Sequence, residues 1–160
     1  MGLWDTLSTK HSYTSLSEPR IAIGIPTINR ADLLLESLQD LSINWGDQLA
    51  KLIIVDNGHQ SIGNIIPENL KSCTTLYEEQ SNLGVSGSWN KILKDSYYGS
   101  NPVDHVLILN DDIVLGKTAL DVYNVTKQYP GYSMICSTYF WSVFLVSKLC
   151  IDTIGGFDVN

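Results

Sequence analysis

Three short apolar runs constrain the fold of this chain more than any other feature. They span Ile21–Ile25, Leu52–Val55 and Val106–Leu109, and none alternates between apolar and polar residues. A strand with one face in water alternates, whereas a strand covered on both faces is continuously apolar. The runs therefore predict a parallel sheet with helices on both sides.

Helical patterns separate these runs. The segment from residue 31 to residue 43 repeats Leu34, Leu38 and Leu41 at helical spacing. Strands that alternate with helices indicate right-handed βαβ units and an α/β fold, with a mainly parallel central sheet flanked by helices. Further helices are expected near 67–70, 82–99, 117–129 and 148–156, and further strands near 73–79, 132–137 and 140–147. We expect residues 1–19 to form an N-terminal arm and residues 20–160 to form one domain.

Polar residues follow each of the three apolar runs. The carboxyl ends of parallel strands meet at one edge of the sheet, where open α/β proteins bind ligands. One such turn would be unremarkable, but three together predict a binding site. Its candidate residues are Pro26, Thr27, Asn29 and Arg30 after the first run, Asp56 and Asn57 after the second, and Asn110, Asp111 and Asp112 after the third.

Composition and missing motifs exclude several functions. The formal net charge of −7 disfavours nucleic-acid binding, which needs basic surface. The chain has no G-x-G-x-x-G after its first strand and no G-x-x-x-x-G-K-[ST], so dinucleotide-binding and P-loop domains are disfavoured. No apolar run has the ~18 residues needed for a membrane span. We expect a cytoplasmic protein, with the cytoplasmic face of a membrane as the alternative location.

The adjacent carboxylates Asp111 and Asp112 favour a hard metal ion. Mg²⁺ and Mn²⁺ prefer oxygen ligands, and Mg²⁺ often uses one or two carboxylates together with substrate phosphates and water. With ten Lys and Arg residues in the chain, a metal is an economical way to neutralise a diphosphate. The alternative is an acidic turn that binds nothing.

Five segments in register resemble the family 2 glycosyltransferases of the Rossmann-like GT-A fold. They are "IAIGIPTINRADLLLESLQDL", "LIIVDNG", "EQSNLGVSGSWNKIL", "VLILNDDIVL" and "IDTIGGFD", and they cover roughly residues 20–158. The resemblance implies a nucleotide-sugar donor, a divalent metal (Mn²⁺ or Mg²⁺), and transfer of the sugar to an acceptor hydroxyl with inversion.

The resemblance also implies roles for individual residues. Asp112 matches the position that binds the metal directly, Asp111 lies nearer the ribose or a metal-bound water, and Asn110 replaces the first carboxylate of the family's DxD motif. Asp56 matches an aspartate that contacts the base, which favours UDP or dTDP over GDP. The family contacts the nucleotide at the positions of Thr27 and Arg30, and shapes the donor pocket near the diphosphate at those of Asn82, Gly84 and Asn90.

Each of these assignments has a structural alternative. Asp56 could be an Asx-turn residue before Asn57 and Gly58. Arg30 could be a solvated residue that opens a helix, and Asn82 and Asn90 could be a helix cap and a helix-surface amide.

The general base of an inverting transfer is not assigned. In the resembled family it lies downstream of the "GGFD" segment, so we expect this sequence to be the donor-binding portion of a longer enzyme. A non-catalytic nucleotide-sugar-binding module and a nucleotidylyltransferase-like enzyme are the alternatives, and the latter is disfavoured by the absence of its glycine- and arginine-containing loop. The acceptor is left open between a glycan, a lipid-linked sugar and a protein.

Overall fold

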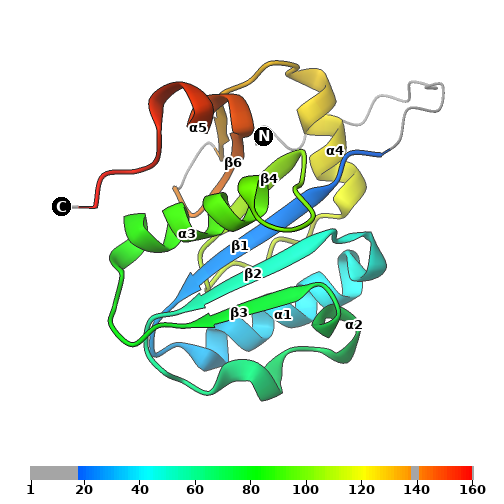
Figure 1. Ribbon diagram of the computed structural model, residues 1–160. Helices are drawn as coiled ribbons and strands as arrows, with labels where there is room; N and C mark the ends of the chain where they lie inside the picture. The colour runs from blue at the N-terminus through cyan, green and yellow to red at the C-terminus, as the bar shows by residue number, and fades with distance from the viewer. Residues whose placement is uncertain (1–17, 138–140, 160) are drawn as a thin grey trace.

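A computed structural model describes residues 18–137 and 141–159, so the expected N-terminal arm lies almost wholly outside the described residues. Helices cover both faces of one twisted sheet (Figure 1). The strands are β1 (Ile21–Thr27), β2 (Lys51–Asp56), β3 (Thr74–Glu78), β4 (His105–Leu109), β5 (Met134–Cys136) and β6 (Val143–Ser147). The helices are α1 (Ala31–Asn44), α2 (Glu68–Lys71), α3 (Gly84–Tyr98), α4 (Ala119–Gln128) and α5 (Lys148–Ile154), with short 3₁₀ turns at Gly46–Gln48 and Ile62–Ile65.

The six strands form one sheet in the order β3-β2-β1-β4-β6-β5. The first four strands are mutually parallel, while β6 runs antiparallel to both β4 and β5. The prediction of a mainly parallel α/β sheet is confirmed. Successive βαβ units progress from β1 towards β3 on one side, and β4 returns to the other side of β1. The topological switch point, where such folds bind ligands, therefore lies between β1 and β4.

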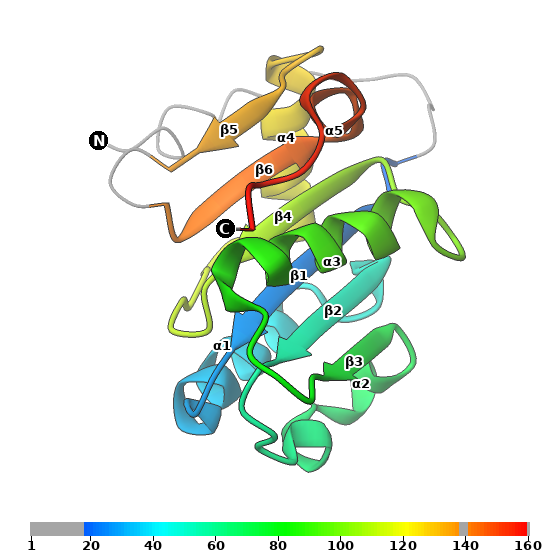
Figure 2. The same ribbon diagram turned by 60° about the vertical axis from the view of Figure 1, so that its left-hand side comes forward.

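Side chains of each central strand point alternately into two apolar layers. On one face, Ile23 and Ile25 pack in a cluster with Leu38 of α1 and Val122 of α4. On the other face, Ala22 packs in a cluster that includes residues of α3 and α5. Figure 2 shows α3 lying across the sheet on the side away from α1. Both faces are covered, which explains why the strands are continuously apolar.

No helix in residues 18–137 and 141–159 is long and apolar enough to cross a bilayer. The cytoplasmic location stays a prediction.

His105, at the start of β4, is expected to make stability fall at mildly acidic pH. Burial lowers the pKa of its imidazole from 6.5, opposed by the nearby carboxylate of Asp104, and its Nδ1 lies 2.8 Å from the Tyr132 hydroxyl. The unfolded chain therefore binds a proton more readily than the folded protein. The contribution of His105 to stability is full above pH 6.5 and is lost as pH falls through the folded pKa.

Urea unfolding between about pH 7.5 and about pH 5.5 measures this effect. His105→Gln should flatten the profile, whereas His59→Gln, which removes an exposed imidazole, should leave it as in the wild type. An unchanged slope in His105→Gln would show that this imidazole does not control the pH dependence.

Candidate functional site

The ends of β1 and β4 and the start of α3 enclose a cleft at the switch point. The cleft has a volume of about 220 Å³. It is lined by Pro26, Thr27, Ile28, Arg30, Asn57, Asn82, Gly84, Val85, Asn110 and Asp111. A larger hollow of about 550 Å³ lies beside Arg20 and Asp47, near the amino end of β1, which is not the edge where parallel sheets hold ligands. We therefore take the cleft at the carboxyl edge as the candidate site.

Thr27 and Asp111 join the two strand ends across the switch point. The Thr27 hydroxyl donates a hydrogen bond of 2.8 Å to Asp111 Oδ2, and both residues are buried. Burial raises the pKa of the Asp111 carboxyl, while the Thr27 hydrogen bond and the charge of Arg30 act in the opposite direction. Two residues 84 positions apart in the chain are thus bonded to each other where they line the cleft.

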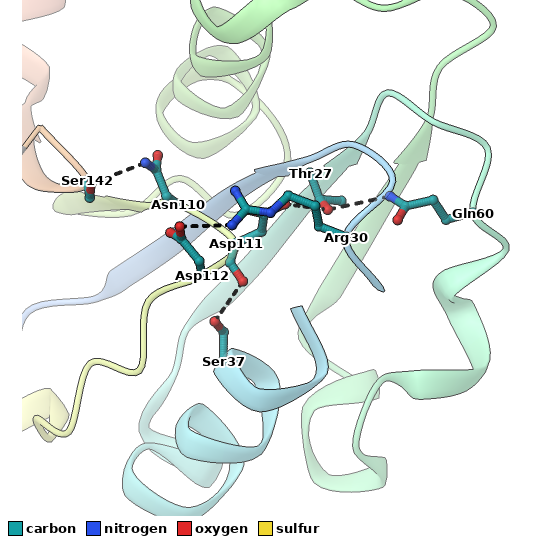
Figure 3. A network of polar contacts seen from close by, with 8 residues as sticks. All are labelled: Thr27, Arg30, Ser37, Gln60, Asn110, Asp111, Asp112 and Ser142. Atoms are coloured by element: carbon teal, nitrogen blue, oxygen red, sulfur yellow. Dashed lines mark hydrogen bonds and ion pairs between the residues drawn. The ribbon is translucent and has the colours of Figure 1, made fainter. Parts of the chain in front are cut away.

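Arg30 bridges the two adjacent carboxylates (Figure 3). One guanidinium nitrogen lies 3.2 Å from Asp111 Oδ1, and the other lies 3.0 Å from Asp112 Oδ2. The hydrogen bond to Asp112, followed by the charge of Asp111, raises the pKa of Arg30. One partly exposed cation therefore offsets part of the negative charge of the carboxylate pair.

Helix α1 holds the backbone of the Asp111–Asp112 turn. The Ser37 hydroxyl donates to the carbonyl of Asp111 over 3.1 Å. Asp40 accepts the amide protons of Leu115 and Gly116 at 3.0 and 3.1 Å. These contacts fix the turn at both ends, so the carboxylates are presented on a rigid support.

Asn110 connects the turn to Ser142, the residue before β6. Its amide donates to the Ser142 hydroxyl over 3.2 Å, and its backbone N–H donates to the Ser142 carbonyl over 2.9 Å. It also lines the cleft, one residue before the carboxylates.

Asp56 has the Asx-turn geometry that the sequence left as an alternative. Its carboxylate is fully buried and accepts backbone protons from Gly58 at 2.9 Å and Gln60 at 2.7 Å. The Gln60 side-chain amide also donates to it, over 2.9 Å. Contact between Asp56 and a base stays a prediction, and in this conformation Gln60 covers the carboxylate.

Asn57, Asn82 and Gly84 shape the start of α3, and their contact with a donor stays a prediction. Asn57 accepts the Leu83 N–H over 2.9 Å and donates to Ser88 Oγ over the same distance. Asn82 accepts the Gly84 N–H over 2.8 Å. Gly84 has a φ of +69°, and no atom lies within 4 Å of a Cβ added there. The backbone conformation therefore favours glycine at this position, and the space around it does not require one. Together these contacts present the first turn of α3 to the cleft.

Asn29 and Asn90 do not line the cleft. Asn29 adopts a left-handed conformation in the turn after β1 and packs against Gly58. The Asn90 side chain pairs with the backbone of Phe157, donating to its carbonyl and accepting from its N–H, each over 2.7 Å. Asn90 therefore fastens the "GGFD" segment to α3, and its contact with a donor stays a prediction.

Several residues of the site escaped the sequence analysis. Ser37 is buried on the face of α1 that also buries Leu34 and Leu38. Gln60 donates to Thr27 Oγ1 over 3.4 Å and has a buried side-chain oxygen without a partner. Ser142 lies in the segment expected to be strand. No local pattern marks the roles of these three residues. Ser37 and Ser142 pair with Asp111 and Asn110, which lie 74 and 32 positions away in the chain.

The donor set is suited to a divalent metal with few protein ligands. Within residues 18–137 and 141–159, no group of three or more His, Cys, Asp and Glu side chains could hold a metal ion. Asp111 and Asp112 supply carboxylate oxygens alone, which suits Mg²⁺ or Mn²⁺ completed by phosphates and water. The Arg30 guanidinium already occupies a cation position between them. The residues present therefore fit such an ion.

The fold is similar to that of solved glycosyltransferase structures. No family model and no curated protein matches the sequence. The mannosyltransferase PcManGT from Pyrobaculum calidifontis, in complex with GDP-Man and Mn²⁺, superposes with a TM-score of 0.71 at 16% identity, over 98% of this chain and 53% of that chain. Residues 1–349 of S. aureus TarS superpose with a TM-score of 0.55 at 17% identity, over 72% of this chain and 34% of that chain.

These similarities show the fold: this chain has the α/β fold of GT-A-like glycosyltransferases. It spans about half the length of the mannosyltransferase and about a third of the TarS chain. Membership of family 2 stays a prediction.

Proposed function

We propose that this protein is the donor-binding part of a metal-dependent glycosyltransferase. It binds a nucleotide-sugar together with Mn²⁺ or Mg²⁺ and serves transfer of the sugar to an acceptor hydroxyl, with inversion. One observation carries this proposal: Thr27, Arg30, Asp111 and Asp112 converge at the switch point of a glycosyltransferase-type sheet.

Each side of the cleft has a role in the proposed complex. Asp112 is the more exposed carboxylate and contacts the metal directly, while Asp111, held by Thr27, faces the ribose or a metal-bound water. The metal, when bound, screens the charge that develops on the departing diphosphate. On the opposite wall, the first turn of α3 carries no acidic residue, which favours a phosphate at this helix N-terminus.

No residue of the cleft is assigned as the general base. Asp111 is the carboxylate among the lining residues, and it is already bonded to Thr27 and Arg30. We propose that the base comes from outside the described residues, in line with the expectation of a longer enzyme. A module that binds the donor without turnover is the second candidate, favoured by this same lack of an unpaired carboxylate in the cleft.

The donor base is predicted to be uracil or thymine. That prediction came from Asp56, which here accepts three internal hydrogen bonds. A base edge would reach its carboxylate after Gln60 turns away. UDP or dTDP is thus expected to bind more tightly than GDP, and replacement of Gln60 by alanine should not weaken that preference.

Isothermal titration calorimetry with UDP, dTDP and GDP, each with and without Mn²⁺, tests the proposal. We expect affinity to rise at least about tenfold with Mn²⁺, because the metal joins the carboxylates to the diphosphate. Absence of metal-dependent binding for all three nucleotides would refute the donor site. Tighter binding of GDP would refute the predicted base and leave the donor site standing.

A further inference from the structure

Arg30 supplies the cation of the cleft, and its side chain lies where it can change position. It is the one Lys or Arg among the cleft-lining residues that the structure describes. Its guanidinium contacts Asp111 and Asp112 with one nitrogen each. Its backbone lies at the N-cap of α1, in the turn that follows β1, and 43% of its side chain is exposed. The side chain is therefore anchored by these two ion pairs and not by core packing.

We propose that Arg30 is a placeholder cation that the incoming metal displaces from the carboxylate pair onto the diphosphate of the donor. The inference rests on the proposed function. The resemblance implies a nucleotide contact for Arg30, and the proposal adds that the metal moves Arg30 there from the carboxylate pair. In the first position Arg30 pairs with Asp111 and Asp112. In the second it would hold the phosphates of the donor.

Electrostatics exclude simultaneous occupancy of the first position. Arg30 pairs with both carboxylates of the proposed metal site, with Asp112 at Oδ2 and with Asp111 at Oδ1. A divalent ion and a guanidinium sharing them would lie within a few ångströms of each other, and like charges at that separation repel strongly even near a protein surface. Binding of the metal therefore weakens both ion pairs of Arg30.

The released guanidinium has a suitable partner nearby. An arginine presents a planar fork of donors that matches phosphate oxygens in a bidentate manner. The α3 end of the cleft, formed by Asn82, Gly84 and Val85, has no cation among these lining residues. Arg30, turned from the carboxylates, would supply the positive charge that a diphosphate needs beyond that of the metal.

This arrangement couples metal and nucleotide binding. Metal binding releases Arg30 from the carboxylates so that it can bind the phosphates. Phosphates that bind Arg30 keep it away from the carboxylates and so favour metal binding. By linkage the two couplings are equal. Arg30 thus opposes metal binding when the nucleotide is absent and supports it when the nucleotide is present.

The test measures Mn²⁺ and nucleotide affinities in Arg30→Gln. Electron paramagnetic resonance gives the dissociation constant of free Mn²⁺ at pH 8, and calorimetry gives those of UDP and GDP at saturating Mn²⁺. We expect Arg30→Gln to bind Mn²⁺ alone on the order of tenfold more tightly, because a competing cation is removed. We expect it to bind the nucleotide with Mn²⁺ on the order of tenfold more weakly, because a charged phosphate contact is lost.

Two variants serve as controls. Arg20→Gln makes the same chemical change at the opposite edge, where Arg20 donates to the Pro102 carbonyl, and should alter neither affinity. Arg30→Lys keeps the charge with a single donor group and should fall between the wild type and Arg30→Gln in both measurements. Thermal unfolding of each variant confirms that it is folded.

The opposite signs of the two effects distinguish the outcomes. If Arg30 were only a structural support, both affinities would fall in Arg30→Gln, and the inference would be wrong. Unchanged Mn²⁺ affinity in Arg30→Gln would likewise overturn it, while leaving the donor site intact. Absence of Mn²⁺ binding in both proteins, even with UDP or GDP, would overturn the proposed function and this inference together.

Discussion

Replacing Asp112 with alanine is expected to remove the metal dependence of nucleotide binding. The variant should bind UDP with Mn²⁺ at least about 100-fold more weakly than the wild type, since even indirect metal partners cost 10- to 100-fold. Asp112 supplies one of two adjacent carboxylates, and Asp111 is buried and shared with Thr27. A single buried carboxylate leaves the ion with too few protein ligands to join it to the diphosphate. Calorimetry with and without Mn²⁺ measures the loss.

Asp47→Ala is the matched control for this variant. Asp47 is also an exposed aspartate, but it borders the hollow near the amino end of β1. Its removal changes the net charge equally and should leave nucleotide binding unaltered. If Asp112→Ala kept wild-type, Mn²⁺-dependent affinity, Asp112 would not be a metal ligand and the donor site would lie elsewhere.

Replacing Gly24 with valine is expected to destabilise the protein by about 3 kcal/mol, since overpacking of a close-packed core costs this much. Gly24 lies in the middle of β1, where α3 crosses the sheet. A Cβ on Gly24 would lie 2.2 Å from Ile92 Cγ2 and 3.2 Å from Ile108 Cδ1. Helix α3 would have to move away from the strand. The melting temperature should fall by about 6–12 °C, as measured by calorimetry or circular dichroism.

Displacement of α3 should also weaken nucleotide binding in Gly24→Val, because the first turn of α3 is one wall of the cleft. Gly63→Ala is the control: a Cβ there meets only the Leu76 side chain at 3.8 Å, so stability should change by less than about 1 kcal/mol. Combining Gly24→Val with Ile92→Ala should cost less than the sum of the two single changes. Strict additivity would show that the close contact between Gly24 and Ile92 does not limit stability.

The strands and helices were largely predictable because their signals are local. The apolar run Ile21–Ile25 and the leucine spacing from Leu34 to Leu41 each report burial within a few residues of sequence. The expectation of three polar strand ends at one edge followed from the parallel arrangement. Thr27 and Asp111 do meet there.

Roles that depend on partners were harder to predict. Asp56 and Asn90 are both polar residues at expected positions. Asp56, however, accepts a hydrogen bond from Gln60 within a turn, and Asn90 pairs with Phe157, 67 residues away. A sequence shows that a side chain can donate or accept a hydrogen bond, but it does not show which group is the partner. In both cases a protein partner satisfies the groups that the resemblance assigned to a ligand.

The sequence by itself determined the class of fold and the carboxylate pair, because burial of strands and ligand chemistry depend on residue types in a short window. Only the tertiary structure decided the strand order β3-β2-β1-β4-β6-β5, which puts β4 beside β1. That order brings Arg30 to Asp112 across 82 residues of chain. The physical reason is that ion pairs of this kind depend on distance in space, and the return of β4 to the far side of β1 sets that distance.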